Sequence, residues 1–399
     1  MAALSKHTTG IMGPTHRWGS SIFRRGLGAR KHWCGPAARA ASTWGAGRRS
    51  FEVIDTHCEG EPARIVVGGM PTIPGETMFE KRNYMMEHMD ELRTMLITEP
   101  RGYPCQNADV ILPPTLQDAA YGFVILEQNK IYPAMSGHNT ICTATALLET
   151  GMIPMVEPVT SFVLEAPAGL IEIDAACSNG KATEITLKNQ PAFVAPGGLD
   201  VVIDVPTFGK VSVDVAYGGM WYCIVDAQAM GLELTPASGK EICRLGEMVK
   251  VACREQFPVQ HPLIDYPGCD IMVFRGPATP GSGATSKNAV VMSNGVLDWE
   301  RPETWTAMID RSPCGTGTCA VMASLWARGE LAIGEDFVHE SIVGTTFTGR
   351  LHCETTVGDQ PAVVPTVAGQ AWITQHCTVV VDPSDPFPHG YTVGDIWLE

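Results

Sequence analysis

The sequence has no uninterrupted apolar stretch of about 20 residues, so it contains no candidate for a membrane-spanning helix. It also lacks a basic surplus, because 28 Lys and Arg residues stand against 43 Asp and Glu residues and leave a formal net charge of −15. Proteins that bind nucleic acids normally carry an excess of positive charge, so this balance disfavours a nucleic-acid partner. We therefore expect neither a membrane nor a nucleic acid among its partners.

The 13 cysteines are scattered along the chain, and no two of them form a CxxC pair. Structural zinc sites favour two closely spaced pairs of ligands, so the spacing predicts no metal site. The thiols are more typical of small buried hydrophobic residues in a reducing compartment than of a disulfide framework.

The N-terminus carries a concentration of positive charge. Residues 1–50 contain no Asp or Glu but nine basic residues, namely Lys6, Lys31, Arg17, Arg24, Arg25, Arg30, Arg39, Arg48 and Arg49. A basic, acid-free leader of this kind is typical of a mitochondrial transit peptide, so we expect a mitochondrial protein. The alternative is a disordered extension without a targeting role, and the protein would then be cytoplasmic. In either case the folded part should begin near Phe51.

With 45% hydrophobic and 18% charged residues, the chain can bury a large core. Beyond residue 50, short β-branched runs alternate with Gly, Pro, Asn or Asp, which is typical of strands. The clearest runs cover residues 63–67, 121–126, 170–173, 200–205, 211–216 and 379–381. Helical periodicity is scarcer and predicts four helices, at residues 78–96, 139–149, 239–256 and 318–328. These patterns predict the α+β class.

An internal repeat relates two of the predicted helices. Residues 136–151 align with residues 314–329 at an offset of 178 residues. The aligned identities are Gly137 with Gly315, Thr140 with Thr318, Leu147 with Leu325 and Gly151 with Gly329. A second matching stretch starts at Glu165 in the first copy and at Glu340 in the second. Each copy contains a turn, a Gly, a short polar cluster, an apolar helix and a closing Gly that can cap the helix.

The repeat predicts two pseudo-symmetric halves, each a mixed β-sheet or barrel around a central helix. We expect the first half to cover residues 51–195 and the second half residues 196–375, with a linker near residues 191–198. Residues 376–399 are expected to return to the first half. An active site shared by two related halves lies naturally in the cleft between them.

Each repeated turn places a nucleophilic side chain directly before a helix, Ser136 in the first copy and Cys314 in the second. A helix N-terminus concentrates about half a positive charge and presents free N–H groups, so two facing N-termini would hold one carboxylate between them. The same charge can lower the pKa of Cys314 toward neutrality and make it a base. Serine is a far weaker acid, so Ser136 needs a partner, and His138 is the nearest candidate. The alternatives are a helix N-cap for Ser136 and an inert buried thiol for Cys314.

Four stretches of the sequence form recognisable motifs. They are Met135-Ser136-Gly137-His138, Asp310-Arg311-Ser312-Pro313-Cys314-Gly315-Thr316-Gly317-Thr318, Asp55-Thr56-His57-Cys58-Glu59-Gly60-Glu61-Pro62 and Tyr217-Gly218-Gly219-Met220. With these four stretches the sequence resembles the proline racemase family. The similarity covers nearly all of residues 51–375, and the stretch around Cys314 is highly specific. The resemblance implies a fold like that of diaminopimelate epimerase and a reaction that needs no cofactor.

In family members that racemise or epimerise, both turns typically carry a cysteine; one thiol removes the α-proton and the other delivers a proton to the opposite face. This sequence departs from that pattern because Ser136 stands at the first turn. Members with one cysteine replaced include dehydratases of trans-3-hydroxy-L-proline, whose α-hydrogen and hydroxyl leave from a single face. The resemblance therefore implies a hydro-lyase that converts trans-3-hydroxy-L-proline to pyrroline-2-carboxylate and water. Two alternatives remain open, a 4-hydroxyproline 2-epimerase (or a bifunctional enzyme) and a non-catalytic amino-acid-binding protein.

The resemblance also implies roles for residues at the matching positions. Ser136 would accept the proton on the L face of the substrate, and Cys314 would be the donor on the other face or a spectator; Cys314 as the base is the alternative. Asp310 would accept a hydrogen bond from the ring ammonium, unless it only pairs with Arg311. The groups that would hold the substrate carboxylate belong to Gly137, His138, Gly315 and Thr316. The expected ligand is a small imino acid and the expected assembly a homodimer.

Overall fold

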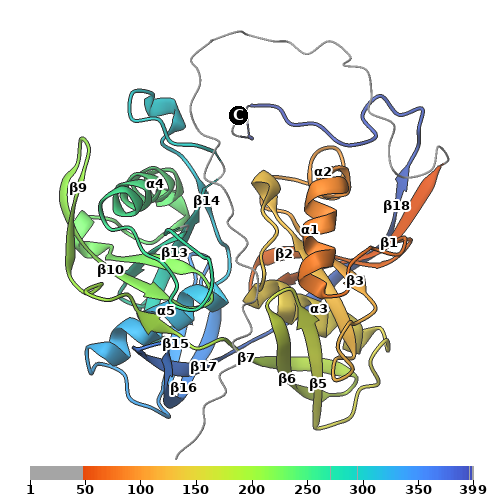
Figure 1. The fold of residues 1–399 in the computed structure, drawn as a ribbon, viewed down its shortest axis with the longest axis horizontal. Helices are drawn as coiled ribbons and strands as arrows, with labels where there is room; N and C mark the ends of the chain where they lie inside the picture. Colours follow the sequence, from red (N-terminus) through yellow and green to blue (C-terminus); the bar gives the residue numbers. More distant parts are fainter. Residues whose placement is uncertain (1–47, 270, 294, 395, 398–399) are drawn as a thin grey trace, which may run out of the picture. The chain divides into compact units, whose positions relative to one another are not determined.

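The computed structural model describes residues 48–397 apart from residues 270, 294 and 395, and these residues belong to one compact unit. The predicted transit peptide lies outside the described residues except for its last three positions, 48–50. All 18 strands of the described chain belong to one hydrogen-bonded set (Figure 1). The protein is of the α+β class, as the sequence predicts.

Seven strands in each half pair in the same succession. In the first half they are β1 (Arg49–Cys58), β2 (Glu61–Gly68), β3 (Asn107–Leu112), β4 (Tyr121–Leu126), β5 (Val159–Ala166), β6 (Gly169–Ser178) and β7 (Lys181–Lys188). In the second half they are β10 (Gly209–Tyr217), β11 (Trp221–Asp226), β12 (Ile271–Gly276), β13 (Ser286–Met292), β15 (Asp336–Glu340), β16 (Thr346–Val357) and β17 (Gln360–Gly369). Both series pair antiparallel, parallel, antiparallel, parallel, antiparallel and antiparallel. The internal repeat of the sequence is therefore part of a larger structural repeat.

Helices occupy the parallel connections, because parallel neighbours need a crossover of a dozen or more residues. The first parallel connection contains α1 (Met78–His88) and α2 (Asp90–Ile97) in the first half and α4 (Gly239–Gln256) in the second half. The second parallel connection contains α3 (Gly137–Glu149) in the first half and α5 (Gly315–Ala327) in the second half. The first residues of α3 and α5 are 178 positions apart, which is the offset of the sequence repeat.

The four predicted helices are all present, with two differences. The periodic segment at residues 78–96 is divided into α1 and α2 at Met89, whose backbone leaves the helical region at φ −137° and ψ 21°. The two central helices begin two and three residues earlier than predicted, because glycines at their first positions carry no apolar side chain for the periodicity to detect. The expected strand runs lie within β2, β4, β6, β9 (Val201–Val205), β10 and β18 (Ala371–Val381), save that residue 200 precedes β9.

Two pairings join the halves. Strand β7 pairs antiparallel with β17, and β18 (Ala371–Val381) returns from the second half to pair antiparallel with β1. The expected boundary after residue 375 falls inside β18, and the other domain boundaries remain predictions. The remaining short elements are β8 (Phe193–Val194), β9 (Val201–Val205), β14 (Met308–Ile309) and the 3₁₀ turns Gln128–Lys130, Gln228–Met230, Pro236–Ser238 and Pro302–Thr304.

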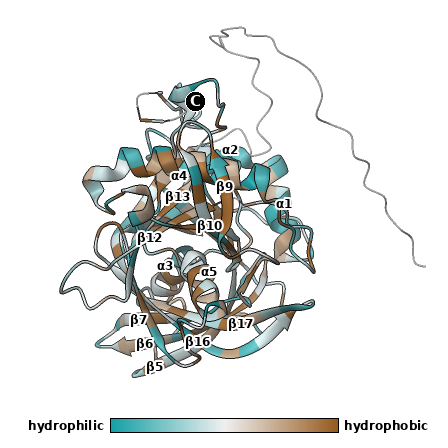
Figure 2. Ribbon diagram, turned by 90° about the vertical axis from the view of Figure 1, so that its left-hand side faces the viewer, coloured by the Kyte–Doolittle hydropathy of each residue, from teal (hydrophilic) through white to brown (hydrophobic). Residues whose placement is uncertain are grey.

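The two central helices are buried on every side. All residues of α3 from Gly137 to Leu148 and all residues of α5 from Gly315 to Leu325 are buried. A helix that is buried all round belongs in a core, and the apolar side chains of both helices belong to one hydrophobic cluster. Figure 2 shows α3 and α5 side by side, and α3 contacts β7 while α5 contacts β16 and β17. Separate clusters form around α4 and around α1 with α2.

The second matching stretch of the sequence repeat also has a structural counterpart. Glu165, near the end of β5, accepts hydrogen bonds from the backbone N–H and the hydroxyl of Thr115. Glu340, at the end of β15, accepts the same two bonds from Thr279. The N–H···O distances are 2.6 and 2.8 Å. Each carboxylate ties a strand that follows a central helix to the loop before β4 or β13.

Candidate active site

The N-termini of α3 and α5 touch each other at a pair of glycines. A Cβ atom added to Gly137 would lie 3.0 Å from the Cα of Gly315, and one added to Gly315 would lie 3.1 Å from the Cα of Gly137. A side chain at either position would push the two helices apart, since backbone cannot yield as a side chain does. The two glycines of the repeat therefore bring the turns that carry Ser136 and Cys314 together.

Ser136 occupies the N-cap position of α3, but its hydroxyl does not cap the helix. Its backbone is extended, with φ −146° and ψ 130°, and its carbonyl accepts hydrogen bonds from the N–H and the hydroxyl of Thr140 at 3.0 and 2.7 Å. The Ser136 hydroxyl instead lies 3.2 Å from Nδ1 of His138 and accepts a hydrogen bond from Nδ2 of Asn139 at 3.1 Å. The hydroxyl thus contacts two side chains of the first turn of α3.

A chain of buried polar groups continues from His138 to the second half. Nε2 of His138 lies 3.1 Å from Nδ2 of Asn107, which also donates to Oε1 of Glu61 at 3.4 Å. Oε2 of Glu61 accepts a hydrogen bond of 2.7 Å from the backbone N–H of Arg311. Burial lowers the pKa of His138, against an opposing effect of the charge on Asp310. Burial and then the same charge raise the pKa of Glu61 well above its usual value.

A second carboxyl group lies behind Asn139. Nδ2 of Asn139 donates to Oε1 of Glu127 at 3.4 Å, in addition to its hydrogen bond with Ser136. Burial, together with the charge on Asp310, raises the pKa of Glu127 to about 8. At neutral pH this carboxyl group is therefore largely protonated, and it places little negative charge beside Ser136.

Cys314 occupies the equivalent N-cap position of α5 with a different backbone. Its φ of 61° and ψ of 113° lie in a region that residues with a side chain rarely adopt, and such strain is common at functional sites. The conformation is held by a hydrogen bond of 3.1 Å from the Cys314 N–H to the hydroxyl of Ser312 and by the Thr318 N–H, which donates to the Cys314 carbonyl at 2.9 Å. The thiol lies 3.3 Å from the hydroxyl of Tyr222 and 3.8 Å from that of Thr316.

Burial has the largest effect on the pKa of the Cys314 thiol. Burial, and then the charge on Asp310, raise the pKa of Cys314 well above its usual value. Hydrogen bonds involving Tyr222, the N–H of Gly317 and Thr316 act in the opposite direction but are weaker. Burial therefore acts against the lowering of this pKa that the helix N-terminus is expected to cause.

Asp310 lies at the junction of the two halves, directly after β14. Its carboxylate accepts a hydrogen bond of 2.8 Å from the Ser312 N–H, and the Arg311 guanidinium donates to the carbonyl of Ile309 at 2.6 Å. The charge on Asp310 affects the pKa of Glu61, Glu127 and His138 in the first half as well as that of Cys314. Asp310 is therefore close to both turns.

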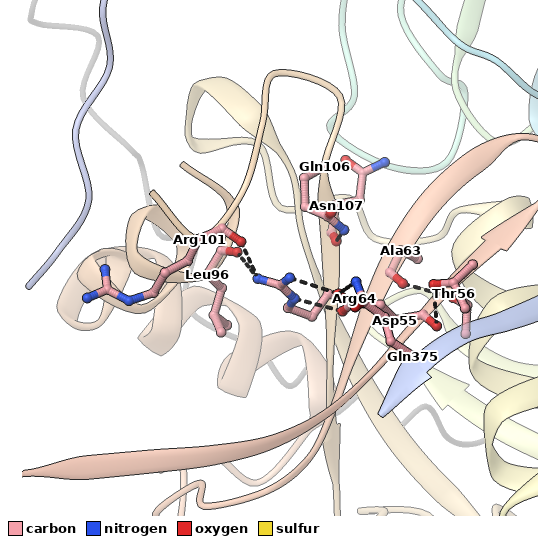
Figure 3. A network of polar contacts seen from close by, with 10 residues as sticks. Asp55, Thr56, Ala63, Arg64, Leu96, Arg101, Gln106, Asn107 and Gln375 are labelled. Atoms are coloured by element: carbon pink, nitrogen blue, oxygen red, sulfur yellow. Dashed lines mark hydrogen bonds and ion pairs between the residues drawn. The ribbon is translucent and has the colours of Figure 1, made fainter. Parts of the chain in front are cut away.

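A buried ion pair supports the segment that leads to Asn107. The Arg64 guanidinium binds both carboxylate oxygens of Asp55, at 2.7 and 2.8 Å, and its Nη1 donates to the carbonyls of Leu96 and Arg101 at 2.8 and 2.7 Å. Figure 3 shows this guanidinium between Asp55 on one side and the two carbonyl groups on the other. Arg64 thus fastens the end of α2 and the following loop to the β1–β2 pair.

Several residues of the site are not singled out by the sequence analysis. They are Asn107, Glu127, Asn139 and Tyr222, together with Glu61, which belongs to a recognised motif without an assigned role. Glu127 is the one with a usable signal, because an acidic residue directly after the apolar run of β4 is unusual in a buried strand end. Asn139 follows Ser136 by three residues, whereas Asn107 and Tyr222 reach the site only through the fold.

Two structural findings bear on the expected partners. Among the described part of residues 48–397, no group of three or more His, Cys, Asp or Glu side chains is placed to hold a metal ion. In the same part of the chain, no helix combines the length and the apolar character needed to cross a membrane.

The fold and the site define a two-half α+β protein with a serine and a cysteine at two touching helix N-termini. The sequence model described as proline racemase matches residues 53–392. The chain belongs to the proline racemase family, and it is an enzyme of that family.

Comparison with known proteins identifies relatives along most of the chain. A 4-hydroxyproline 2-epimerase of Streptosporangium roseum is 44% identical over 346 residues, which cover 86% of this chain and 98% of the relative. A proline racemase of Clostridioides difficile is 41% identical over 345 residues, with the same two coverages. The solved structure of a hydroxyproline epimerase from Agrobacterium vitis, with bound trans-4-hydroxy-L-proline, has a TM-score of 0.77 and 36% identity, and the match covers 88% of this chain and 96% of that chain.

A more distant likeness concerns the fold alone. The phenazine biosynthesis protein of the PhzF family from Bacillus anthracis has a TM-score of 0.52 at 13% identity, over 83% of this chain and 99% of that chain. The expected two-half fold is thus confirmed. The named relatives are epimerases and racemases acting on proline or hydroxyproline, so they favour the epimerase alternative over the dehydratase that the sequence analysis ranks first.

Proposed function

We propose that this enzyme inverts the α-carbon of 4-hydroxyproline without a cofactor, as a 4-hydroxyproline 2-epimerase. The observation that carries the proposal is the contact between Gly137 and Gly315, which brings Ser136 and Cys314 to one place from two different halves. Inversion needs one group on each face of the α-carbon, and these two side chains supply such a pair. The relatives named above support 4-hydroxyproline as the substrate.

In this proposal the substrate lies between the two helix N-termini. Free N–H groups and the helix dipoles favour an anion there, so the carboxylate would contact the backbone N–H groups of Gly137, His138 and Gly315 and the side chain of Thr316. Asp310 would accept a hydrogen bond from the ring ammonium, because its charge lies near both turns. Neutralising the carboxylate in this way would make the α-proton easier to remove.

The reaction then consists of two proton transfers. Ser136, as the alkoxide, would take the α-proton on the L face, so the C–H bond breaks, its electron pair remains on the substrate as a carbanion, and Ser136 becomes the hydroxyl. Cys314 would deliver its thiol proton to the other face, forming a new C–H bond and leaving a thiolate. In the reverse direction the roles exchange, and the protonated Cys314 of this structure fits the donor role.

A second candidate is the dehydration of trans-3-hydroxy-L-proline to pyrroline-2-carboxylate. The observation in its favour is the chemical difference between the hydroxyl of Ser136 and the thiol of Cys314. A two-base exchange works best with groups of similar acidity, whereas elimination on one face needs a single base. One enzyme could also catalyse both reactions.

The test is incubation with trans-4-hydroxy-L-proline and, separately, with trans-3-hydroxy-L-proline. Chiral chromatography would follow inversion at the α-carbon, and o-aminobenzaldehyde would trap any imine formed by loss of water. We expect the cis-4-hydroxy-D epimer from the first substrate. Imine from the second substrate without inversion of the first would favour the dehydratase. An absence of both products, with thermal stabilisation by pyrrole-2-carboxylate, would favour a binding protein.

We also propose that residues 1–50 direct the protein to mitochondria, because nine basic residues stand there without an acidic one. A fluorescent protein fused behind these residues should enter mitochondria. A cytosolic fusion would instead support an extension without a targeting role.

A further inference from the structure

The hydrogen bonds around Ser136 determine which of its neighbours donate. Nδ2 of Asn139, 3.1 Å from the Ser136 oxygen, belongs to an NH₂ group that can only donate. Its second N–H points to Oε1 of Glu127 at 3.4 Å, so the amide is oriented by an acceptor on each side. The Ser136 oxygen therefore accepts at least one hydrogen bond.

The second neighbour, His138, has its tautomer set by Asn107. Nδ2 of Asn107 lies 3.1 Å from Nε2 of His138 and 3.4 Å from Oε1 of Glu61, so this NH₂ group donates to both. A neutral imidazole has one donor and one acceptor, and burial keeps His138 neutral by lowering its pKa. Because Nε2 accepts, the hydrogen resides on Nδ1, which faces the Ser136 oxygen at 3.2 Å.

We propose that His138 and Asn139 form a two-donor hole, that is, a pair of N–H donors that face the oxygen of Ser136. Asn107 is a positioning residue that keeps His138 in the tautomer that donates from Nδ1. With both lone pairs of the oxygen occupied, the hydroxyl hydrogen of Ser136 must point away from these side chains. In this arrangement His138 never receives the proton of Ser136. It stabilises the alkoxide of Ser136 instead.

This inference rests on the proposed epimerase function and explains how a serine can serve there. When Ser136 protonates the carbanion, its O–H bond breaks, a C–H bond forms at the α-carbon, and the electron pair left on oxygen is held by two N–H groups. In the reverse direction the alkoxide takes the α-proton and the hydroxyl is restored. Preorganised N–H donors aimed at an oxyanion make this charge less costly, and hydrogen bonds to a charged group are the strong ones.

The first experiment observes the tautomer directly. In enzyme labelled with ¹⁵N-histidine, the His138 signals are assigned by their loss in His138→Gln, and the ring nitrogen shifts report which nitrogen carries the hydrogen. We expect Nδ1–H in the wild type. Asn107→Asp puts an acceptor opposite Nε2 and should move the hydrogen to Nε2, whereas Asn107→Leu, with neither donor nor acceptor, should leave a mixture. A wild-type Nε2–H tautomer would overturn the proposal.

The second experiment measures turnover. Loss of one donor to an oxyanion typically lowers kcat by about 10²–10³, so we expect Asn139→Leu and Asn107→Asp each to lower kcat by about this factor with little change in KM. Thr143→Val is the matched control, because Thr143 lies one turn further along α3 and its hydroxyl donates to Asp109 rather than to Ser136. Full activity in Asn107→Asp with a moved hydrogen would also overturn the proposal.

The two readouts separate this inference from the proposed function. Nδ1–H in the wild type together with no inversion of 4-hydroxyproline would refute the proposed function and leave the hydrogen-bond geometry standing. Inversion by a wild type with Nε2–H would refute the two-donor hole alone. Thermal unfolding of each variant identifies any loss of activity that comes from a loss of folding.

Discussion

The two turns at the centre of this molecule are copies of one structural unit, yet each surrounds its nucleophile differently. Ser136 has an extended backbone, and its hydroxyl contacts His138 and Asn139, behind which other buried polar groups lie. Cys314 has a strained backbone with φ 61°, and its thiol contacts the hydroxyls of Tyr222 and Thr316. Duplication thus preserved the helix N-termini while the groups around each nucleophile diverged.

The difference follows the chemistry of the two side chains. A thiol is intrinsically a stronger acid than an alcohol, and the two hydroxyl groups and the backbone N–H beside Cys314 lower its pKa against the larger effect of burial. A serine hydroxyl is a much weaker acid and needs stronger donors. The nitrogen donors of His138 and Asn139 beside Ser136 meet that need. Glu127 accepts a hydrogen bond from Asn139, and Glu61 accepts one from Asn107, which contacts His138.

The largest expected effect on activity comes from removing one of the two proposed catalytic side chains, Ser136 and Cys314. Cys314→Ala should lower inversion of 4-hydroxyproline by about 10³-fold or more, because a positioned acid or base contributes about 10²–10⁴. Chiral chromatography of the product measures the rate. Cys319→Ala is the control, since Cys319 is also buried in α5 but lies beyond its first turn. Equal losses in both variants would mean that the loss reflects packing and not chemistry.

Separating the two turns should have the next largest effect. Gly137→Ala puts a methyl group 3.0 Å from the Cα of Gly315, so the helices must move apart. A displacement near 1 Å can cost about 10²-fold in rate, and we expect a loss of this size. Gly239→Ala is the control, because Gly239 likewise begins a helix but has its nearest neighbour at 3.8 Å. Unchanged turnover in Gly137→Ala would contradict a site shared by the two N-termini.

Making the two turns chemically alike gives a smaller effect. Ser136→Cys would pair two thiols, so exchange of the α-hydrogen in deuterated water should rise by on the order of tenfold, as the acidities become matched. Mass spectrometry of recovered substrate measures the incorporated deuterium. If exchange does not rise, Ser136 and Cys314 do not act on opposite faces of one carbon.

The smallest expected effect concerns stability. The pKa of Glu127 is raised from 4.5 to about 8, so the folded protein binds this proton more tightly and the free energy of unfolding falls as pH rises from about 4.5 to about 8. Glu127→Gln should remove this fall and be more stable than the wild type at pH 8, since each unit of pKa shift corresponds to about 1.4 kcal/mol. Chemical denaturation at both pH values measures the difference, with the exposed Glu184→Gln as control. If the free energy of unfolding of Glu127→Gln depends on pH as in the wild type, a group other than Glu127 titrates in this range.

Much of the fold is predictable from the sequence because periodicity and repetition are local properties. The offset of 178 residues locates both central helices, and the repeated Glu165 and Glu340 lie at equivalent strand ends. The break at Met89 and the early starts of α3 and α5 are missed, since propensity and apolar spacing say little about glycines at a helix start. The serine at position 136 also led the sequence analysis to a dehydratase, whereas the named relatives favour an epimerase.

By itself, the sequence determined the family, the two-half architecture and the side chains that stand at the two repeated turns, because motifs and repeats are written in order along the chain. The tertiary structure alone decided their surroundings. Asn107 reaches His138 from strand β3, Tyr222 reaches Cys314 from 92 positions away, and burial raises the pKa of Cys314 where a helix dipole alone would lower it. Desolvation and hydrogen bonding depend on neighbours in space, and only folding brings those neighbours together.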